Sequence, residues 1–307
     1  MSAVLLVPAL LLDAVLGEPK FLWSRLPHPA VLMGRAVGFV EVRLNSGEQR
    51  KLKGAAAMLG LAILAMALGW VIHALPDFGV IEVVVAAILL AQKSLVQHVQ
   101  AVGDALRLSL GDGRRAVAMI VGRDTGGMDD AAVSRAAIES AAENFSDGVI
   151  APAFWFLIGG LPGLMLYKIT NTADSMIGHR TPRYEQFGWA AARFDDLLNL
   201  VPARLTAVII AGVQGCLGAG AVIVRDAALH RSPNAGWPEA AMAVALNLSL
   251  SGPCSYDGMM TEFPYVYPEG RRDAGPDDID GSVAVLWRSW AGFLVGVIVM
   301  AMIGVVV

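Results

Sequence analysis

Ionisable side chains recur every fourth residue in an alanine-rich stretch near the middle of the chain. Arg135, Glu139 and Glu143 are spaced so that all three lie on one face of a helix. Asn144 and Asp147 follow, where we expect this helix to end. The face is either a solvated surface with an internal Arg–Glu pair or part of a polar site. An uncharged stretch follows directly, and ionisable groups beside membrane segments tend to mark function.

Two later segments carry further polar groups at helical spacing. Asp195 and Asp196 are adjacent, with Asn199 about one turn further on. Adjacent carboxylates repel unless a cation lies between them, so Mg²⁺ or Arg204 is the expected partner. Salt bridges at the membrane surface are the alternative. In the segment 168–180, helical spacing also brings four polar side chains near one another, namely Lys168, Asn171, Asp174 and Ser175.

Turns rich in glycine, proline and polar residues precede two of the expected helices. The turn 122–127 contains Arg123 and Asp124, and Thr125 or Asp129 is placed to cap the helix after it. A glycine-rich turn at a helix start can bind phosphate. A second tight turn at 230–236 leads into an alanine-rich helix, with Pro238 in its first turn.

Familiar nucleotide and metal motifs are missing from the sequence. It contains no P-loop, no dinucleotide fingerprint, no H-E-x-x-H and no paired-cysteine motif. Cys216 and Cys254 cannot form a four-thiolate site or a disulfide scaffold. A net charge of -4 gives no support for nucleic-acid binding. Any nucleotide or metal must therefore be bound by scattered Asp, Glu, Asn, Arg and Lys, and such oxygen ligands suit Mg²⁺.

The composition is that of a membrane protein. Of 307 residues, 56% are apolar and 16% are charged, whereas soluble domains usually carry about a quarter charged residues. We predict an all-α, polytopic integral membrane protein with about five or six membrane helices, each needing roughly 20 residues to span. No run suggests strands. The candidate segments are 2–12, 55–75, 80–91 (continuing as a helix through 110), 150–167, 205–224 and 289–307.

The basic residues constrain the topology. All 23 Lys and Arg fall in the polar segments 18–54, 93–149, 168–204 and 225–290. The positive-inside rule places the first two on the cytoplasmic side, with the helices between them as an outward hairpin. A simple crossing by 150–167 would put the third segment outside. Its break at 159–163 instead allows a re-entrant pair of half-helices.

The remaining polar chain is expected to connect these helices. Residues 264–281 are rich in proline, glycine and aspartate, which indicates a mobile surface loop. Because there is no internal repeat, we predict one membrane-embedded domain, 1–307.

Eight runs follow one another along the chain: 11–13, 17–19, 122–125, 137–148, 171–178, 187–196, 202–205 and 232–241. In this order they resemble the adenosylcobinamide-phosphate synthase family of cobalamin biosynthesis (the CobD/CbiB family). The likeness extends from Leu11 to about Gly258 and weakens over 259–285. His179 differs from the aromatic residue expected there, which leaves a role for this side chain open.

The resemblance implies a membrane-bound ligase of the cell (inner) membrane with a cytoplasmic active face. Such enzymes use ATP and Mg²⁺ to join adenosylcobyric acid to aminopropanol, as its O-phosphate or free. Other late cobalamin-pathway enzymes are possible partners, besides the lipid bilayer.

Amide formation from a carboxylate needs activation by phosphate and then attack by a neutral amine. We expect the catalytic residues to be Glu139, Glu143, Asp174 and Glu239, with Asp174 or Glu239 as general base. The expected metal ligands are Glu143, Asp147, Asp195 and Asp196. Substrate and phosphate binding is expected from Arg123, Asp124, Lys168, Asn171, Ser175, Arg180 and Asn234.

Two other functions fit some of the same features. Broken apolar helices with carboxylates also suit an ion-coupled transporter, although the polar residues mostly lie at the ends of spans and no repeat is present. A scaffold for late corrinoid enzymes is the third hypothesis. In either case, ATP-dependent product formation in detergent would be absent.

Overall fold

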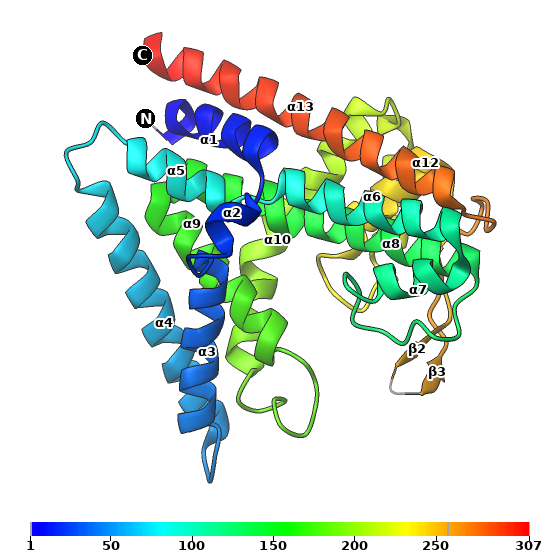
Figure 1. Cartoon of the computed structure of the whole chain (residues 1–307), viewed down its shortest axis with the longest axis horizontal. Helices are drawn as coiled ribbons and strands as arrows, with labels where there is room; N and C mark the ends of the chain where they lie inside the picture. Colours follow the sequence, from blue (N-terminus) through cyan, green and yellow to red (C-terminus); the bar gives the residue numbers. More distant parts are fainter. Residues whose placement is uncertain (1, 257, 307) are drawn as a thin grey trace. The chain divides into compact units, whose positions relative to one another are not determined.

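A computed structural model describes residues 2–256 and 258–306. Over these residues the fold is almost entirely helical (Figure 1). Five helical segments are long and apolar enough to cross a membrane. The prediction of an all-α, polytopic membrane protein is therefore confirmed, while its sidedness stays a prediction. The five segments are Arg50–His73, Val80–Leu108, Asp130–Ile177, Trp189–Val213 and Pro276–Gly304.

The chain divides into two compact units. Unit 1 comprises the chain up to Ala91, Ala151–Leu200 and the C-terminal part from Val297. Unit 2 comprises Gln92–Ile150 and Val201–Gly296. The single membrane-embedded domain, 1–307, stays a prediction.

Unit 1 is built from helices that include several with large exposed apolar side chains, such as Leu59, Ile63 and Leu64. Its helices are α1 (Ser2–Leu16), α2 (Lys20–Trp23), α3 (Pro29–Leu44), α4 (Arg50–His73), α5 (Val80–Leu89), α9 (Ala151–Ile177) and the start of α10 (Trp189–Val213). The buried stripe of α4 consists of small and apolar residues, including Ala62, Ala65 and Gly69. This stripe packs on α9, and a Cβ at Gly69 would meet the backbone of Pro162.

Helix α9 reverses direction at its glycine-rich break. Gly160 adopts φ 60° and ψ -154°, a conformation close to glycine-only backbone. Beyond it, a Cβ at Gly163 would lie directly against the carbonyl of Trp155, eight residues earlier. In a straight helix these positions would be about 12 Å apart. The predicted pair of half-helices is therefore present, and its re-entry from one membrane face stays a prediction.

Unit 2 surrounds the alanine-rich helix predicted at 135–148. This helix, α8 (Asp130–Phe145), packs between α6 (Gln92–Leu108) and α12 (Gly236–Leu246). Asp129 caps α8 by accepting a hydrogen bond from the Ala132 amide at 2.7 Å, as one of the two predicted caps. The other helical elements are α7 (Leu110–Val117), η1 (Ser146–Ile150), η2 (Leu217–Ala219), α11 (Gly220–Ala227) and most of α13 (Pro276–Val306).

The end of α8 differs from the prediction. Asn144 lies inside α8, and the chain continues through one π-helical turn, η1, directly into α9. Gly148 does not stop the helix because π turns insert a residue without ending helical hydrogen bonding. Such turns are frequent at functional sites.

Two further helix boundaries also differ. The predicted span 205–224 begins much earlier, at Trp189, and ends at Val213. It was misplaced because the carboxylates at 195 and 196 lie inside the helix rather than before it. The predicted helix 80–110 is interrupted at Leu90, which has extended φ and ψ.

Four short strands were not predicted. β1 (Leu250–Ser251) pairs antiparallel with β4 (Tyr265–Val266), and β2 (Cys254–Tyr256) pairs with β3 (Met259–Thr261). Strands of two or three residues are too short to show an alternating pattern. The predicted mobile loop 264–281 is also partly wrong, because Val266 and Ala274 are buried and α13 begins at Pro276.

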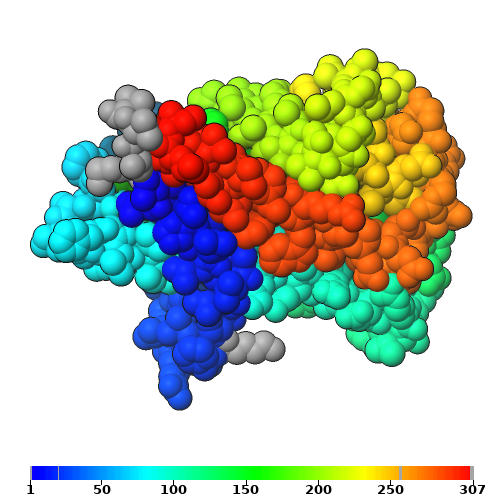
Figure 2. Space-filling model, turned by 90° about the horizontal axis from the view of Figure 1, so that it is seen from above, coloured from blue at the N-terminus to red at the C-terminus, as the bar shows by residue number. Residues whose placement is uncertain are grey.

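The C-terminal helix has the surface of a lipid-facing segment. Figure 2 shows α13, coloured orange to red, open at the surface. Large apolar side chains on its second half are exposed, among them Val295, Val299 and Met302. An exposed apolar surface of this extent is expected for a helix in hydrocarbon rather than in water.

The reversal within α9 predicts different effects for neighbouring glycines. Gly163→Ala should lower the free energy of unfolding by about 1–3 kcal/mol, because its methyl group would overlap the Trp155 carbonyl. Gly159→Ala is the control, since a Cβ there meets no atom within 4 Å. The measurement is thermal unfolding in detergent, and equal melting temperatures for the two variants would contradict the reversal.

Candidate active site

In unit 2, Glu139 is buried and ion-paired. Its side chain is 5% exposed, and Arg123 Nη2 donates to Glu139 Oε2 at 2.6 Å. Arg135, the neighbour on the same helix face, instead donates to the Arg272 carbonyl at 3.0 Å. The solvated face with an internal Arg135–Glu139 pair is therefore wrong, because the turn 122–127 supplies the arginine.

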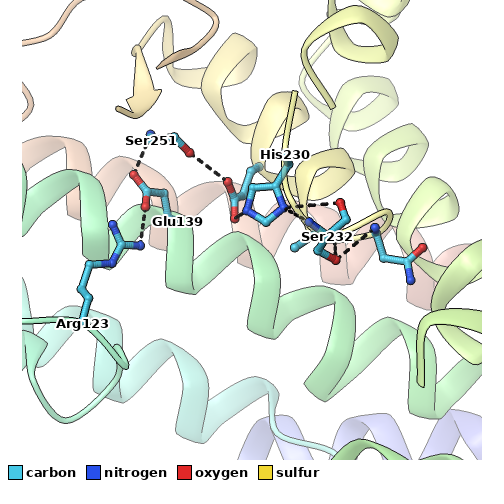
Figure 3. A network of polar contacts seen from close by, with 8 residues as sticks. Arg123, Glu139, His230, Ser232 and Ser251 are labelled. Carbon is cyan, nitrogen blue, oxygen red and sulfur yellow. Dashed lines mark hydrogen bonds and ion pairs between the residues drawn. The ribbon is translucent and has the colours of Figure 1, made fainter. Parts of the chain in front are cut away.

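A second buried carboxylate, Glu239 on α12, lies beside this pair. Ser251 connects the two (Figure 3): its amide donates to Glu139 Oε1 at 2.7 Å, and its hydroxyl to Glu239 Oε2 at 3.4 Å. Ser251 has a left-handed φ of 58°. The strain of a non-glycine residue in this region fits a functional position.

Burial raises the pKa of Glu239 well above its ordinary value. The main cause is the loss of hydration, and the charges of Glu139 and Glu143 raise it further. Arg123 and the Ser251 hydroxyl oppose this rise. Glu239 is thus a carboxyl group that holds a proton more readily than an exposed glutamate.

His230 faces Glu239 from the turn before α12. Its Nε2 lies 3.6 Å from Glu239 Oε1, and its Nδ1 accepts a hydrogen bond from the Ser232 amide at 3.0 Å (Figure 3). Nδ1 of the ring thus contacts the Ser232 backbone, and Nε2 faces the carboxyl group of Glu239. Burial lowers the pKa of His230, which keeps the ring neutral.

Asp124 fastens the β2–β3 hairpin to the turn 122–127. Its carboxylate accepts hydrogen bonds from the Gly258 amide at 2.7 Å and the Ser255 hydroxyl at 2.8 Å. These two bonds lower the pKa of Asp124, with the Gly258 amide contributing most. Asp124 therefore has structural partners, and its predicted phosphate contact stays a prediction.

The other predicted residues of unit 2 lie around this cluster. Glu143 is exposed but close enough to interact electrostatically with Glu239. Asp147 is half-buried in η1. Asn234 is buried and accepts a hydrogen bond from Arg204 Nη1 at 3.2 Å.

In unit 1, the buried carboxylate Asp195 is held by amides. Asn199 Nδ2 donates to Asp195 Oδ2 at 2.9 Å, and Asn171 Nδ2 to Oδ1 at 3.4 Å. The Tyr167 hydroxyl extends this hydrogen-bond network by donating to Asn199 Oδ1 at 3.0 Å. Both oxygens of Asp195 thus accept from neutral donors, which orient this carboxylate firmly.

Two half-buried carboxylates surround Asp195. Asp174 interacts electrostatically with both Asp195 and Asp196. Asp196 accepts from Arg193 Nη1 at 3.0 Å and also interacts with Arg180. One partner of Asp196 is thus Arg193 of its own helix, and the expected pairing with Mg²⁺ or Arg204 stays a prediction.

Helix α9 positions the remaining predicted residues of unit 1. Lys168, Asn171, Asp174 and Ser175 all lie on its second half, as their spacing predicted. Lys168 is half-buried and Ser175 is exposed. His179 contacts the Ser175 carbonyl at 2.9 Å through Nε2, so its observed role is local.

The predicted site residues therefore form two groups, one within each unit. That both groups share one pocket stays a prediction. Among the described residues, no three His, Cys, Asp or Glu side chains come together closely enough to hold a metal ion. Mg²⁺ commonly takes only one or two protein carboxylates and completes its shell with substrate phosphate oxygens and water, so fewer than three carboxylates are compatible with a magnesium site.

Sequence reasoning missed several residues that build these groups. Ser251 precedes no recognisable motif, so nothing marked it. Tyr167 ends an apolar run and resembles a packing residue. His230 and Asn199 were visible as polar neighbours of predicted residues, and their spacing was the available signal.

Comparisons with known proteins show the family of the chain. A family model described as CobD/Cbib protein matches residues 6–286. Proteins named cobalamin biosynthesis protein CobD are 51% identical in Rhizobium meliloti (strain 1021), over 93% of both chains, and 48% identical in Sinorhizobium sp., over 96% of this chain and 97% of the relative. A relative of the same name in Rhodobacter capsulatus is 43% identical over 94% of both chains. No solved structure matches.

The fold and the two groups define a class: a polytopic helical membrane protein with buried, compensated carboxylates. The family match covers most of the sequence. The chain belongs to the CobD/CbiB family.

The raised pKa of Glu239 predicts a pH dependence of stability. The pKa of Glu239 is higher in the folded protein than in the unfolded chain, where it is near 4.5. The protonated group therefore stabilises the fold fully below pH 4.5, and this contribution is lost as the pH rises toward the pKa of the folded state. Glu239→Gln should therefore gain melting temperature relative to the wild type between pH 5 and 8, by a margin that grows with pH. The exposed control Glu262→Gln should follow the wild type. A constant margin for Glu239→Gln would contradict the shift.

Proposed function

We propose that this protein is an ATP-dependent amide-forming ligase of cobalamin biosynthesis. It joins the propionate carboxyl group of adenosylcobyric acid to the amino group of (R)-1-amino-2-propanol O-phosphate, or of free aminopropanol, and yields adenosylcobinamide phosphate or adenosylcobinamide. Membership of the CobD/CbiB family supports the pathway. The residue chemistry described above supports the reaction type.

One observation supports amide formation most directly: the buried Glu139–Ser251–Glu239 arrangement. An amine substrate arrives as an ammonium ion and must lose a proton before it can attack. Two buried carboxyl groups beside one arginine attract a cation, and the raised pKa of Glu239 makes its carboxylate a stronger proton acceptor than an exposed glutamate.

The first chemical step is activation of the carboxylate. A propionate oxygen attacks the γ-phosphorus of ATP, the bond from γ-phosphorus to the bridging oxygen breaks, and ADP leaves. The acyl phosphate that forms has a good leaving group. Basic side chains that can hold the triphosphate in unit 1 are Lys168, Arg180 and Arg193, and Arg does so with two parallel hydrogen bonds.

The second step forms the amide. Glu239 accepts a proton from the ammonium group, the neutral amine attacks the carbonyl carbon, and inorganic phosphate leaves. Glu139, paired with Arg123, lies beside Glu239, and the two side chains together bind the ammonium group before proton transfer. The neutral His230 faces Glu239 and keeps the acceptor oriented.

Magnesium would be held by Asp174 and Asp196 together with phosphate oxygens. When bound, the ion neutralises charge on the transferring phosphoryl group. Asp195 is already engaged by Asn171 and Asn199, so we assign it to orientation of this group. The predicted metal ligands Glu143 and Asp147 belong to unit 2, where we place the amine.

The location proposed for this reaction is the cytoplasmic face of the cell (inner) membrane. Five candidate spans among the described residues support a membrane location. The concentration of basic residues in the polar segments supports a cytoplasmic face. Other late cobalamin-pathway enzymes are proposed partners there.

A reconstitution in detergent tests the function. Purified protein is incubated with adenosylcobyric acid, ATP, Mg²⁺ and each candidate amine, and the corrinoid and nucleotide products are separated. We expect one ADP for each amide formed, with one amine strongly preferred. Absence of ATP-dependent product with either amine would overturn the ligase and leave a transporter or scaffold.

The proton acceptor predicts a specific kinetic loss. Glu239→Gln should lower kcat by about 10²–10⁴-fold, because the amide keeps the size of the side chain but cannot accept a proton. The exposed Glu269→Gln variant serves as the control and should keep wild-type turnover. Wild-type kcat in Glu239→Gln would remove Glu239 from the mechanism.

A further inference from the structure

The loop 178–188 connects the two helices that carry the unit 1 carboxylates. It follows Asp174 on α9 and precedes Asp195 and Asp196 on α10. The first and last residues of the loop are tightly packed: a Cβ at Gly178 would meet the Asp174 carboxylate, and one at Gly188 would meet the Ile177 carbonyl. The loop conformation therefore determines how these helix ends are placed.

A buried glutamate on α3 holds this loop. Glu41 is 6% exposed, and Arg183 donates to both of its oxygens, from Nε and from Nη2, at 3.1 Å each. This is the bidentate geometry in which an arginine fixes orientation as well as distance. The hydrogen bonds from Arg183 also lower the pKa of Glu41, which keeps the carboxylate ionised at neutral pH.

Neighbouring residues strengthen the same attachment. Asn45 Nδ2 donates to Glu41 Oε1 at 3.0 Å and to the Arg183 carbonyl at 3.1 Å. Arg50 donates to the carbonyls of Arg183 and Pro182, at 3.4 Å each. The α3–α4 corner thus binds the loop backbone and not only one side chain. This corner is remote in sequence from the carboxylates, and the chemistry proposed above does not use it.

Arg180 links the attachment of this loop to the carboxylates of unit 1. It lies in the loop three residues before Arg183 and interacts electrostatically with Asp196. A rigid loop keeps this guanidinium beside the carboxylates, where an incoming triphosphate needs a cation. A loosened loop would let the exposed Arg180 side chain move away from Asp196. Loss of positioning by even about 1 Å can cost about 10²-fold in enzymes.

We propose that Glu41 and Arg183 are positioning residues that hold loop 178–188 so that Arg180 can bind the triphosphate of magnesium-ATP. This inference rests on the proposed ligase function and adds the residues that set its nucleotide affinity. The pair touches neither substrate. It acts through Arg180, so it affects nucleotide binding and leaves corrinoid binding unchanged.

Substitution of Arg183 tests the proposal. Arg183→Gln should weaken binding of a non-hydrolysable ATP analogue with Mg²⁺ by about 10–100-fold and raise the KM for ATP similarly, with an unchanged KM for adenosylcobyric acid. Glu41→Gln should do the same. Arg183→Lys keeps the charge but loses the bidentate geometry, so its affinity for the ATP analogue should lie between those of the wild type and Arg183→Gln.

A matched control and a second readout separate positioning from general damage. Arg43→Gln removes an exposed arginine of the same helix that stacks on Phe39 at 3.5 Å and should bind the analogue normally. Amide hydrogen exchange of residues 178–188 should accelerate in Arg183→Gln and not in Arg43→Gln.

Two results would overturn the proposal, and they differ from each other. If Arg183→Gln binds the ATP analogue as tightly as the wild type, whatever its amide exchange rate, Glu41 and Arg183 do not set nucleotide affinity. The ligase function would be unaffected by that result. A wild-type protein that neither binds the analogue nor forms ADP would remove the ligase function itself, and the positioning role would fall with it.

Discussion

A carboxylate buried among apolar helices must meet a cation, hydrogen-bond donors or a proton, because an unpaired buried charge costs more free energy than a fold can supply. The chain meets this constraint in three ways. Glu139 has an arginine, Asp195 has two amides and Glu239 has a raised pKa that favours a proton. This requirement accounts for two contacts. The turn 122–127 supplies Arg123 to Glu139, and the left-handed Ser251 donates to both glutamates.

Much of the fold could be predicted because membrane helices have a strong compositional signal. The break at 159–163 was readable as paired half-helices, since glycine and proline mark it. Other boundaries were not readable. The span with Asp195 and Asp196 begins well before its apolar run, because tertiary hydrogen bonds allow carboxylates inside a helix. Strands of two or three residues carry no periodicity, and the π turn after α8 has no sequence signature.

The site was predictable only in part, for a similar physical reason. Helical spacing correctly grouped residues within one segment, such as Asn171 and Asp174 on α9. It could not identify partners from other segments. Arg123 rather than Arg135 pairs with Glu139, and Ser251 donates to Glu139 across a separation of 112 residues. Such pairings depend on how helices pack, and no local pattern encodes them.

The most direct test of the ligase chemistry is the fate of the carboxylate oxygen. Adenosylcobyric acid labelled with ¹⁸O in its propionate carboxyl group is converted by the purified protein, and the released phosphate is examined by mass spectrometry. Activation by the γ-phosphoryl group predicts one ¹⁸O in inorganic phosphate for each amide formed, with ADP as the nucleotide product. Unlabelled phosphate, or label transferred to AMP, would contradict it.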